Sequence, residues 1–176
     1  MPDSIEQLVE RVRRRLREHD SPCEIAGPVP EAAITAAEDA LGVTFPPSYR
    51  SFLLTFGGIS IPAHLGVVHS FVGVAPPEAR EAREASAEAR DDVVSRTLAA
   101  RVERNLGEHL VVVGMGAQFQ EWFCLDVSRT TASGECPVLL YDARDNALDQ
   151  QFYDDFGQML SEVMGFVADN LDQPLD

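Results

Sequence analysis

Apolar residues recur every three or four positions in several stretches of the chain, a spacing that predicts amphipathic helices. The first stretch, residues 1–20, is predicted to be such a helix, and Ser4 and Gln7 have capping-box spacing at its start. Its apolar stripe consists of Ile5, Leu8, Val9, Val12 and Leu16. Its arginines mostly occupy the other faces, where we expect them to pair with acidic groups of the same molecule.

Further helices are predicted over residues 31–41, 47–56 and 152–170. Residues 78–105 also have helical composition, but the part from 78 to 92 is polar on all sides and is predicted to be an exposed helix. The part that follows gains an apolar face from Val94, Leu98 and Val102.

Runs of β-branched and aromatic residues predict strands over residues 66–74, 109–114, 121–127 and 137–142. The last three runs are separated by short gaps, which indicates antiparallel neighbours. Helices first, then a sheet and a closing helix, are the order of an α+β fold. We therefore expect residues 1–176 to form one domain with a core over about 25–170. In it a mostly antiparallel sheet packs against N-terminal helices and a C-terminal helix, and part of its other face stays exposed.

Residues 41–58, LGVTFPPSYRSFLLTFGG, combine glycines, prolines and aromatic residues in a short space. Gly42 suits the left-handed end of one helix, and two prolines then stop the chain and start the next helix. The side chains predicted to be buried are Phe45, Tyr49, Phe52, Leu53 and Phe56. The segment is therefore predicted to be a corner that packs two helices on the sheet.

The net charge is −15, from 14 arginines, no lysine and 29 acidic residues. The acid is concentrated in residues 105–176, which carry thirteen acids and two arginines. Such a surface repels nucleic acid and anionic membranes and suits a basic protein partner. Alternatively, the charge serves solubility alone.

Two glycine pairs invite a cofactor interpretation that their context does not favour. Gly114 and Gly116 follow a predicted strand, but Phe119 stands where a dinucleotide fingerprint needs glycine, so a hairpin turn is the better interpretation. Gly57-Gly58 follows a helix, whose carboxyl end repels phosphate, and the chain has no lysine for a phosphate loop. No cofactor is expected.

Histidines and cysteines show no metal-ligand spacing, so no metal is expected. His69 is interpreted as a half-exposed structural residue on a strand, and Cys124 as a small buried hydrophobe. A nucleophilic pair of Cys136 and His109 stays open as an alternative. The odd number of cysteines, with Cys23 as the third, and the absence of an apolar leader predict a cytoplasmic protein with reduced thiols.

A cluster of aspartates follows the last predicted strand, and its members are Asp142, Asp145, Asp149, Asp154 and Asp155. The last two stand near the start of the closing helix, where the helix dipole favours acids. Capping and solubility are one interpretation. The other is an acidic patch that docks a basic partner and speeds its association.

The chain resembles the SUKH superfamily, which comprises bacterial immunity proteins and fungal cell-wall-assembly regulators. The signature is an inward Ile, an Ala-Glu pair, Leu-Gly, an aromatic residue before Pro, another aromatic residue, Phe-Leu and Gly-Gly. Its residues here are Ile34, Glu38, Leu41, Gly42, Phe45, Pro46, Tyr49, Phe52, Leu53, Gly57 and Gly58. The later segments LVVVGMG, WFCLDV and PVLLYD are also similar in style to the family.

The resemblance implies an α+β domain that binds proteins and is not an enzyme. Many bacterial members neutralise a toxin of their own strain, so we expect an immunity protein that binds a cognate toxin, such as a basic nuclease, through the five aspartates. The alternatives are a regulatory scaffold of the cell-wall-assembly type and a small enzyme with an unrecognised Cys/His site.

Overall fold

The computed structural model describes residues 3–21, 23–75, 92–116 and 120–171. The helices in these ranges are α1 (Ile5–Glu18), α2 (Glu31–Leu41), α3 (Pro47–Thr55), α5 (Val93–Arg104) and α6 (Phe156–Leu171). The strands are β1 (Glu24–Ile25), β2 (Ile59–Ser60), β3 (Ser70–Phe71), β4 (Leu110–Gly116), β5 (Glu121–Asp126), β6 (Val138–Asp142) and β7 (Ala147–Tyr153). Helices and strands share a hydrophobic core, and the predicted α+β fold is confirmed.

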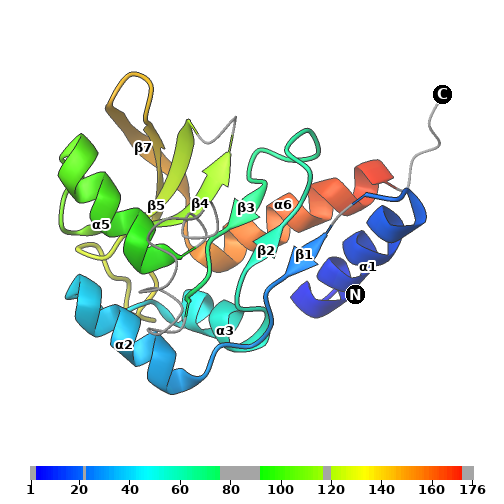
Figure 1. The fold of residues 1–176 in the computed structure, drawn as a ribbon, viewed down its shortest axis with the longest axis horizontal. Coiled ribbons are helices and arrows are strands. Elements are labelled where there is room, and N and C mark those ends of the chain that lie inside the picture. Colours follow the sequence, from blue (N-terminus) through cyan, green and yellow to red (C-terminus); the bar gives the residue numbers. More distant parts are fainter. Residues whose placement is uncertain (1–2, 22, 76–91, 117–119, 172–176) are drawn as a thin grey trace.

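The strands form one antiparallel sheet, in which each strand pairs with the next strand along the chain (Figure 1). Strands β1, β2 and β3 have two residues each, whereas β4 to β7 have five to seven. In the long part, Val111 lies opposite Leu125 and Phe123 lies opposite Leu140. The two edges of the sheet are therefore β1 and β7, at opposite ends.

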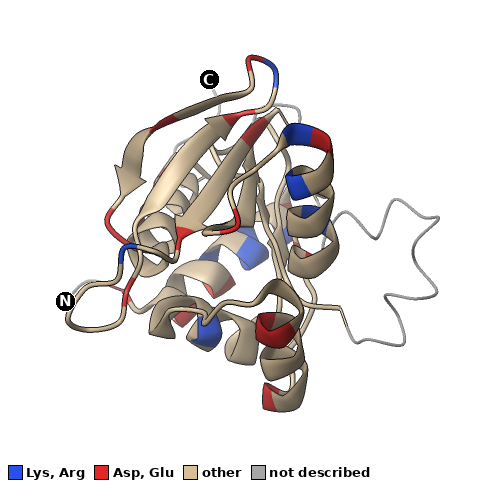
Figure 2. Ribbon diagram, turned by 90° about the vertical axis from the view of Figure 1, so that its left-hand side faces the viewer, with Lys and Arg blue, Asp and Glu red and all other residues tan. Residues whose placement is uncertain are grey.

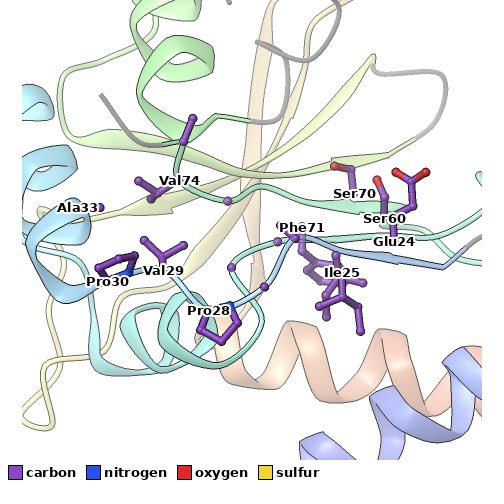
Figure 3. A pocket seen from close by; sticks show the side chains of 17 residues that line it. Glu24, Ile25, Pro28, Val29, Pro30, Ala33, Ser60, Ser70, Phe71 and Val74 are labelled. Carbon is purple, nitrogen blue, oxygen red and sulfur yellow. The ribbon is translucent and has the colours of Figure 1, made fainter. Parts of the chain in front are cut away.

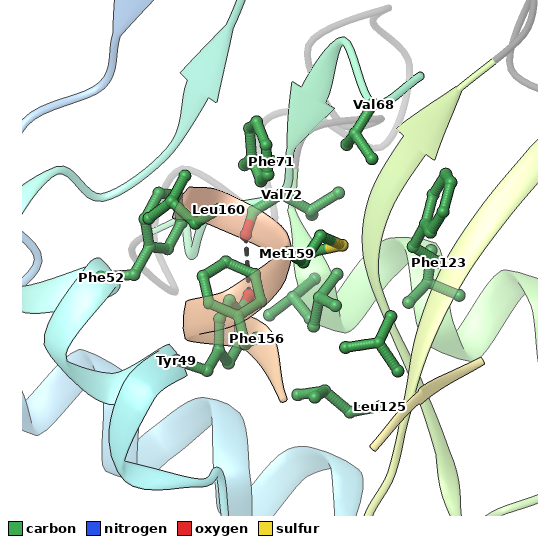
Figure 4. Packing of buried hydrophobic residues seen from close by; sticks show 14 of the residues in the cluster. Tyr49, Phe52, Val68, Phe71, Val72, Phe123, Leu125, Phe156, Met159 and Leu160 are labelled. Carbon is green, nitrogen blue, oxygen red and sulfur yellow. Dashed lines mark hydrogen bonds between the residues drawn. The ribbon is translucent and has the colours of Figure 1, made fainter. Parts of the chain in front are cut away.

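Helices cover both faces of the long strands. On one face, Phe123 and Leu125 of β5 point toward Phe156 and Met159 of α6, with α3 beside them (Figure 4). Helix α5 packs against β4 on the other face, where the Thr97 hydroxyl oxygen accepts a hydrogen bond from a backbone N–H of β4 at 3.1 Å. The buried side chains of β4 and β5 lie between these two layers.

Helix α1 lies against α6 (Figure 1). The predicted capping box of Ser4 and Gln7 is present, and the buried stripe consists of Val9, Val12 and Leu16. Arg11 pairs with Asp169 at 3.3 Å, and Arg15 donates to the carbonyl of the last residue of α6 at 2.8 Å. These two arginines therefore tie α1 to α6, as the pairing hypothesis predicts.

The C-terminal part differs from the prediction. The helix predicted over residues 152–170 begins at Phe156, and the residues before it form strand β7. Asn146 takes a left-handed conformation (φ 53°) and turns the chain back along β6. Asp155 then starts α6 by accepting a hydrogen bond from the backbone N–H of Gln158 at 2.8 Å. Phe152 therefore lies on an edge strand.

Helix α5 is rotated relative to the prediction. Leu98 and Val102, expected inside, are 41% and 86% exposed, and the buried residues in the same helix include Thr97 and Ala100. The small side chains of Thr97 and Ala100 allow the helix to approach the sheet, and Thr97 bonds to β4. On α6, Phe166 is 61% exposed.

The strand predicted over residues 66–74 is reduced to Ser70–Phe71. The Val72 N–H still bonds to β4, but Gly73 pairs with Asp92, which lies outside the sheet. His69 is buried rather than half-exposed. Gly114 and Gly116 lie inside β4 rather than in a turn. A side chain on Gly116 would collide with the backbone carbonyl oxygen of Val67, so packing explains this glycine.

The polar helix predicted over residues 78–92 lies outside the described residues except for its last residue. Asp92 is buried and caps α5 by accepting a hydrogen bond from the Ser95 N–H at 3.1 Å. Its other carboxylate oxygen accepts a hydrogen bond from the Ala75 N–H at 2.9 Å. Asp92 therefore joins the start of α5 to the chain that follows β3.

Candidate partner-binding surface

The aromatic side chains of residues 45–56 form the centre of the core. Phe45, Tyr49, Phe52, Leu53 and Phe56 are all at most 8% exposed, which confirms the predicted corner. The Tyr49 hydroxyl donates to a backbone carbonyl at the end of β3 at 2.7 Å (Figure 4), and burial raises the pKa of this phenol well above its usual value. This segment is packed inside and cannot contact a partner directly.

Glu38 is the polar member of the signature, and it holds the loop between α2 and α3. Its carboxylate accepts a hydrogen bond from the Phe45 N–H at 2.8 Å and pairs with Arg50 at 2.7 Å. Arg50 also pairs with Glu31 at 2.7 Å, and hydrogen bonds to Glu38 and then Glu31 raise its pKa. Both carboxylates therefore serve the corner.

The signature glycines have backbone roles as well. Gly42 ends α2 with a left-handed φ of 67°, and open space surrounds the position of its missing side chain. Gly57 is also left-handed, at 72°, and a side chain there would collide with the carbonyl oxygen of Gly27. The signature residues therefore build the fold, and a contact surface has to be sought elsewhere.

The acidic surface, defined here as Asp142, Asp145, Asp149, Asp154 and Asp155, extends from the β6–β7 turn to the start of α6. Figure 2 shows acidic positions in red along this hairpin. The only basic residue between positions 142 and 155 is Arg144, at the turn. The five carboxylates predicted from the sequence are thus brought to one edge of the sheet.

Two of the five carboxylates are half-buried and hold a turn or a helix start. Asp142 accepts a hydrogen bond from the Arg144 N–H at 2.8 Å, which closes the turn. Asp155 caps α6. The capping interpretation therefore describes Asp155, whereas Asp142 serves the turn.

The other three carboxylates, Asp145, Asp149 and Asp154, are exposed. Asp149 accepts a hydrogen bond from the N–H of Gln150 at 2.7 Å, and Asp154 accepts one from the Gln151 amide at 2.9 Å. Within the described ranges, no arginine or histidine forms an ion pair with any of the five. Their negative charge is therefore available to an external cation.

Strand β7 is an edge strand whose free side is poorly suited to pairing with a further strand. Its register with β6 shifts twice, around residues 149–150 and at Phe152. In addition, the Asp149 carboxylate accepts a hydrogen bond from the Gln150 N–H, so this donor is not free to pair with another strand. Bulges and charges of this kind blunt an edge against strand addition. We therefore expect this edge to be contacted through its side chains.

Two apolar residues of β7 accompany the carboxylates, and sequence reasoning missed both. Leu148 is 47% exposed and Phe152 is 50% exposed, with the Phe152 ring 5.8 Å from that of Phe123. Beside β7, a hollow of about 350 Å³ is bordered by Arg129 and Asp154. No periodicity marks these residues, because the bulges break the alternation of β7.

Burial holds the two candidate cysteine nucleophiles in their thiol form. Burial raises the pKa of Cys124 to about 12, and it also raises the pKa of Cys136. The pKa of His69 is lowered, again mainly by burial. His64, His69 and Cys136 line neither the hollow beside β7 nor the groove beside β1, β2 and β3.

In the four described ranges, no group of three or more His, Cys, Asp and Glu side chains is placed to hold a metal ion. No helix in the same ranges combines the length and the apolar character that a membrane crossing requires.

Comparison with protein families identifies a family for this chain. The sequence model of the SMI1 / KNR4 family (SUKH-1) matches residues 28–162, which include the corner, strands β2 to β7 and the acidic surface. No curated protein matches the chain.

Proposed function

The chain belongs to the SMI1 / KNR4 family (SUKH-1), and from this membership we propose that it is a non-enzymatic, protein-binding immunity protein. In this proposal it neutralises a cognate toxin domain of basic character, such as a nuclease, in the cytoplasm. The proposal treats residues 1–176 as one domain, and the packing of α1 on α6 supports this. Three cysteines without disulfide bonds support the cytoplasmic location.

The observation that carries the proposal is the set of exposed carboxylates without ion pairs on the acidic surface. A nuclease that holds phosphate groups needs a basic site, and a carboxylate array can occupy such a site in place of phosphate. Asp145, Asp149 and Asp154 offer three such carboxylates. The exposed apolar side chains of Leu148 and Phe152 lie on the same strand region. A polar rim around an apolar centre is the usual composition of a protein interface.

Calorimetric titration of the full chain against the toxin domain encoded by the adjacent gene tests the proposal. We expect saturable binding and loss of the toxin's activity in the complex. An endogenous basic partner in place of a toxin would instead favour the regulatory scaffold. If the adjacent genes encode no toxin domain and no basic partner binds, the proposal is wrong.

A matched pair of triple variants tests the surface. Asp145→Asn, Asp149→Asn and Asp154→Asn remove three charges from the acidic surface. Glu6→Gln, Asp20→Asn and Asp39→Asn remove the same number from exposed positions elsewhere. We expect the first triple variant to weaken binding about tenfold or more and the second less than threefold, because close complementary charges dominate distant ones.

A further inference from the structure

A groove of about 470 Å³ lies at the other end of the sheet from the acidic surface. Strands β1, β2 and β3 form one side of it, and the chain segments 26–30 and 73–75 form the rest. Figure 3 shows Pro28, Val29, Pro30 and Val74 along this second side. The volume falls within the range of small-ligand sites, roughly 300–1,000 Å³.

Three polar side chains form a row on the strand side of the groove. Glu24 pairs with Ser60 across β1 and β2, and Ser60 pairs with Ser70 across β2 and β3. Their oxygen atoms point to the same side of the strands, while Ile25 and Phe71 point to the opposite side (Figure 3). Because neighbouring strands are about 4.8 Å apart, the row spans roughly 10 Å.

None of these three side chains has a partner within the described part of the chain. The Ser70 residue is 3% exposed, but its hydroxyl oxygen keeps access to the groove. In that part of the chain neither the Ser70 hydroxyl nor the Ser60 hydroxyl forms a hydrogen bond. The Glu24 carboxylate is exposed and forms no ion pair in the same part. The hydroxyls and the carboxylate are therefore available to water or to a ligand that enters the groove.

Glycines allow the backbone segments that form the wall of the groove to pack closely. Gly57 approaches the carbonyl oxygen of Gly27, and Gly73 approaches the carbonyl oxygen of Gly57, so closely that a side chain on either would collide. Ala26 and the backbone of Gly73 lie 3.5 Å from the position of a side chain on Gly58. All of these residues line the groove, which gives the Gly-Gly pair of the signature a place in its wall.

The charge of the groove selects the ligand. Among the described residues that line the groove, Glu24 is the single charged one, and the whole chain carries −15, so an anion such as phosphate is repelled. A carboxylate followed by two hydroxyl oxygens accepts N–H groups, and its charge strengthens such bonds. The proline and valine side suits a short alkyl chain.

We propose that this groove binds a primary ammonium or guanidinium group carried on a short alkyl chain. The cation bonds to Glu24 and Ser60, the Ser70 hydroxyl accepts a further N–H, and the alkyl chain lies against Val29 and Val74. Such a group is present in free alkylamines and in lysine or arginine side chains of a protein. The site is separate from the acidic surface and does not depend on it.

Nuclear magnetic resonance titration of the ¹⁵N-labelled full chain with cadaverine and with agmatine tests this inference. We expect the largest amide shifts at residues 24–30, 57–60 and 70–75. Glu24→Gln should weaken binding about tenfold, and Ser70→Ala roughly threefold or more. The spectrum of each variant shows at the same time that it is folded.

Exposed residues outside the groove supply the controls. Glu6→Gln and Ser51→Ala should change the affinity less than twofold. An equal loss in Glu6→Gln and Glu24→Gln, or shifts spread over the acidic surface, would show mere attraction to net charge and overturn the inference. Equal binding of neutral 1,5-pentanediol, binding of inorganic phosphate in the groove, or no binding of either amine would also overturn it.

A capped Gly-Arg-Gly peptide distinguishes the two sources of the cation. Tighter binding of the peptide than of agmatine indicates a protein side chain as the source, and tighter binding of agmatine indicates a free amine.

Discussion

At the scale of the residue, the family signature is a set of backbone and packing solutions. Glu38 accepts a hydrogen bond from the Phe45 N–H and forms an ion pair with Arg50. The two left-handed glycines turn the chain at positions where other residues would be strained. The buried aromatic residues and the glycine turns were predictable from the sequence, because apolar spacing and glycine positions are local signals. The partner of Glu38 and the collision at Gly57 were not, since they depend on how distant backbones meet.

Gly57→Ala and Gly42→Ala separate strain from collision. Both residues have a left-handed φ, but only Gly57 faces the carbonyl oxygen of Gly27. We expect Gly42→Ala to lower the free energy of unfolding by about 1–2 kcal/mol and Gly57→Ala by roughly 2–5 kcal/mol. Urea denaturation measures both, and equal losses would show that the close approach to Gly27 is absent.

The buried His69 predicts a loss of stability in mild acid. Burial lowers the pKa of His69 below the ordinary value of 6.5. Between the two pKa values, the unfolded chain is therefore protonated at this residue while the folded chain is not. Its contribution to stability is therefore complete above pH 6.5 and is lost as the pH falls toward the folded pKa. His69→Gln should have a flatter pH dependence of unfolding below 6.5 than the exposed-site control His19→Gln, and identical slopes would contradict this.

At the scale of the element, α1, α2, α3 and the antiparallel order of the later strands follow from periodicity and short connections. Strand β7 could not be predicted in this way, because its bulges interrupt the alternation of apolar and polar residues. The aspartates that follow it also resemble the start of a helix. The rotation of α5 also escapes the pattern, since small residues rather than large ones face the sheet. The groove lies on two-residue strands, which are too short to show any period.

Helix α3 shows how an element can depend on a distant residue. It starts at two prolines without a side-chain cap of its own, and Glu135 accepts hydrogen bonds from the Ser48 N–H at 3.0 Å and hydroxyl at 2.6 Å. Glu135→Ala should therefore cost about 1–2 kcal/mol of unfolding free energy, as the loss of a helix cap does. Glu103→Ala, at an exposed site on α5, should stay within about 0.5 kcal/mol, and similar losses for both would refute the capping role.

At the scale of the whole molecule, charge and topology act together. The sheet order places β1 and β7 at opposite edges, so the groove and the acidic surface are separate, and a ligand in one leaves the other open. The cluster of five aspartates was predictable from the sequence. Which of them are used in turns and caps, and which are available to a partner, required the hydrogen bonds of the structure.

The association rate constant of the chain with its basic partner, measured by stopped flow at low and high salt, tests the central claim most directly. If the acidic surface directs the encounter, the triple variant at Asp145, Asp149 and Asp154 associates about tenfold more slowly at low salt, and the difference shrinks at high salt. The control triple variant at Glu6, Asp20 and Asp39 should slow association less than twofold. Equal slowing by the two variants would show that net charge alone acts, and no slowing by either would place the interface elsewhere.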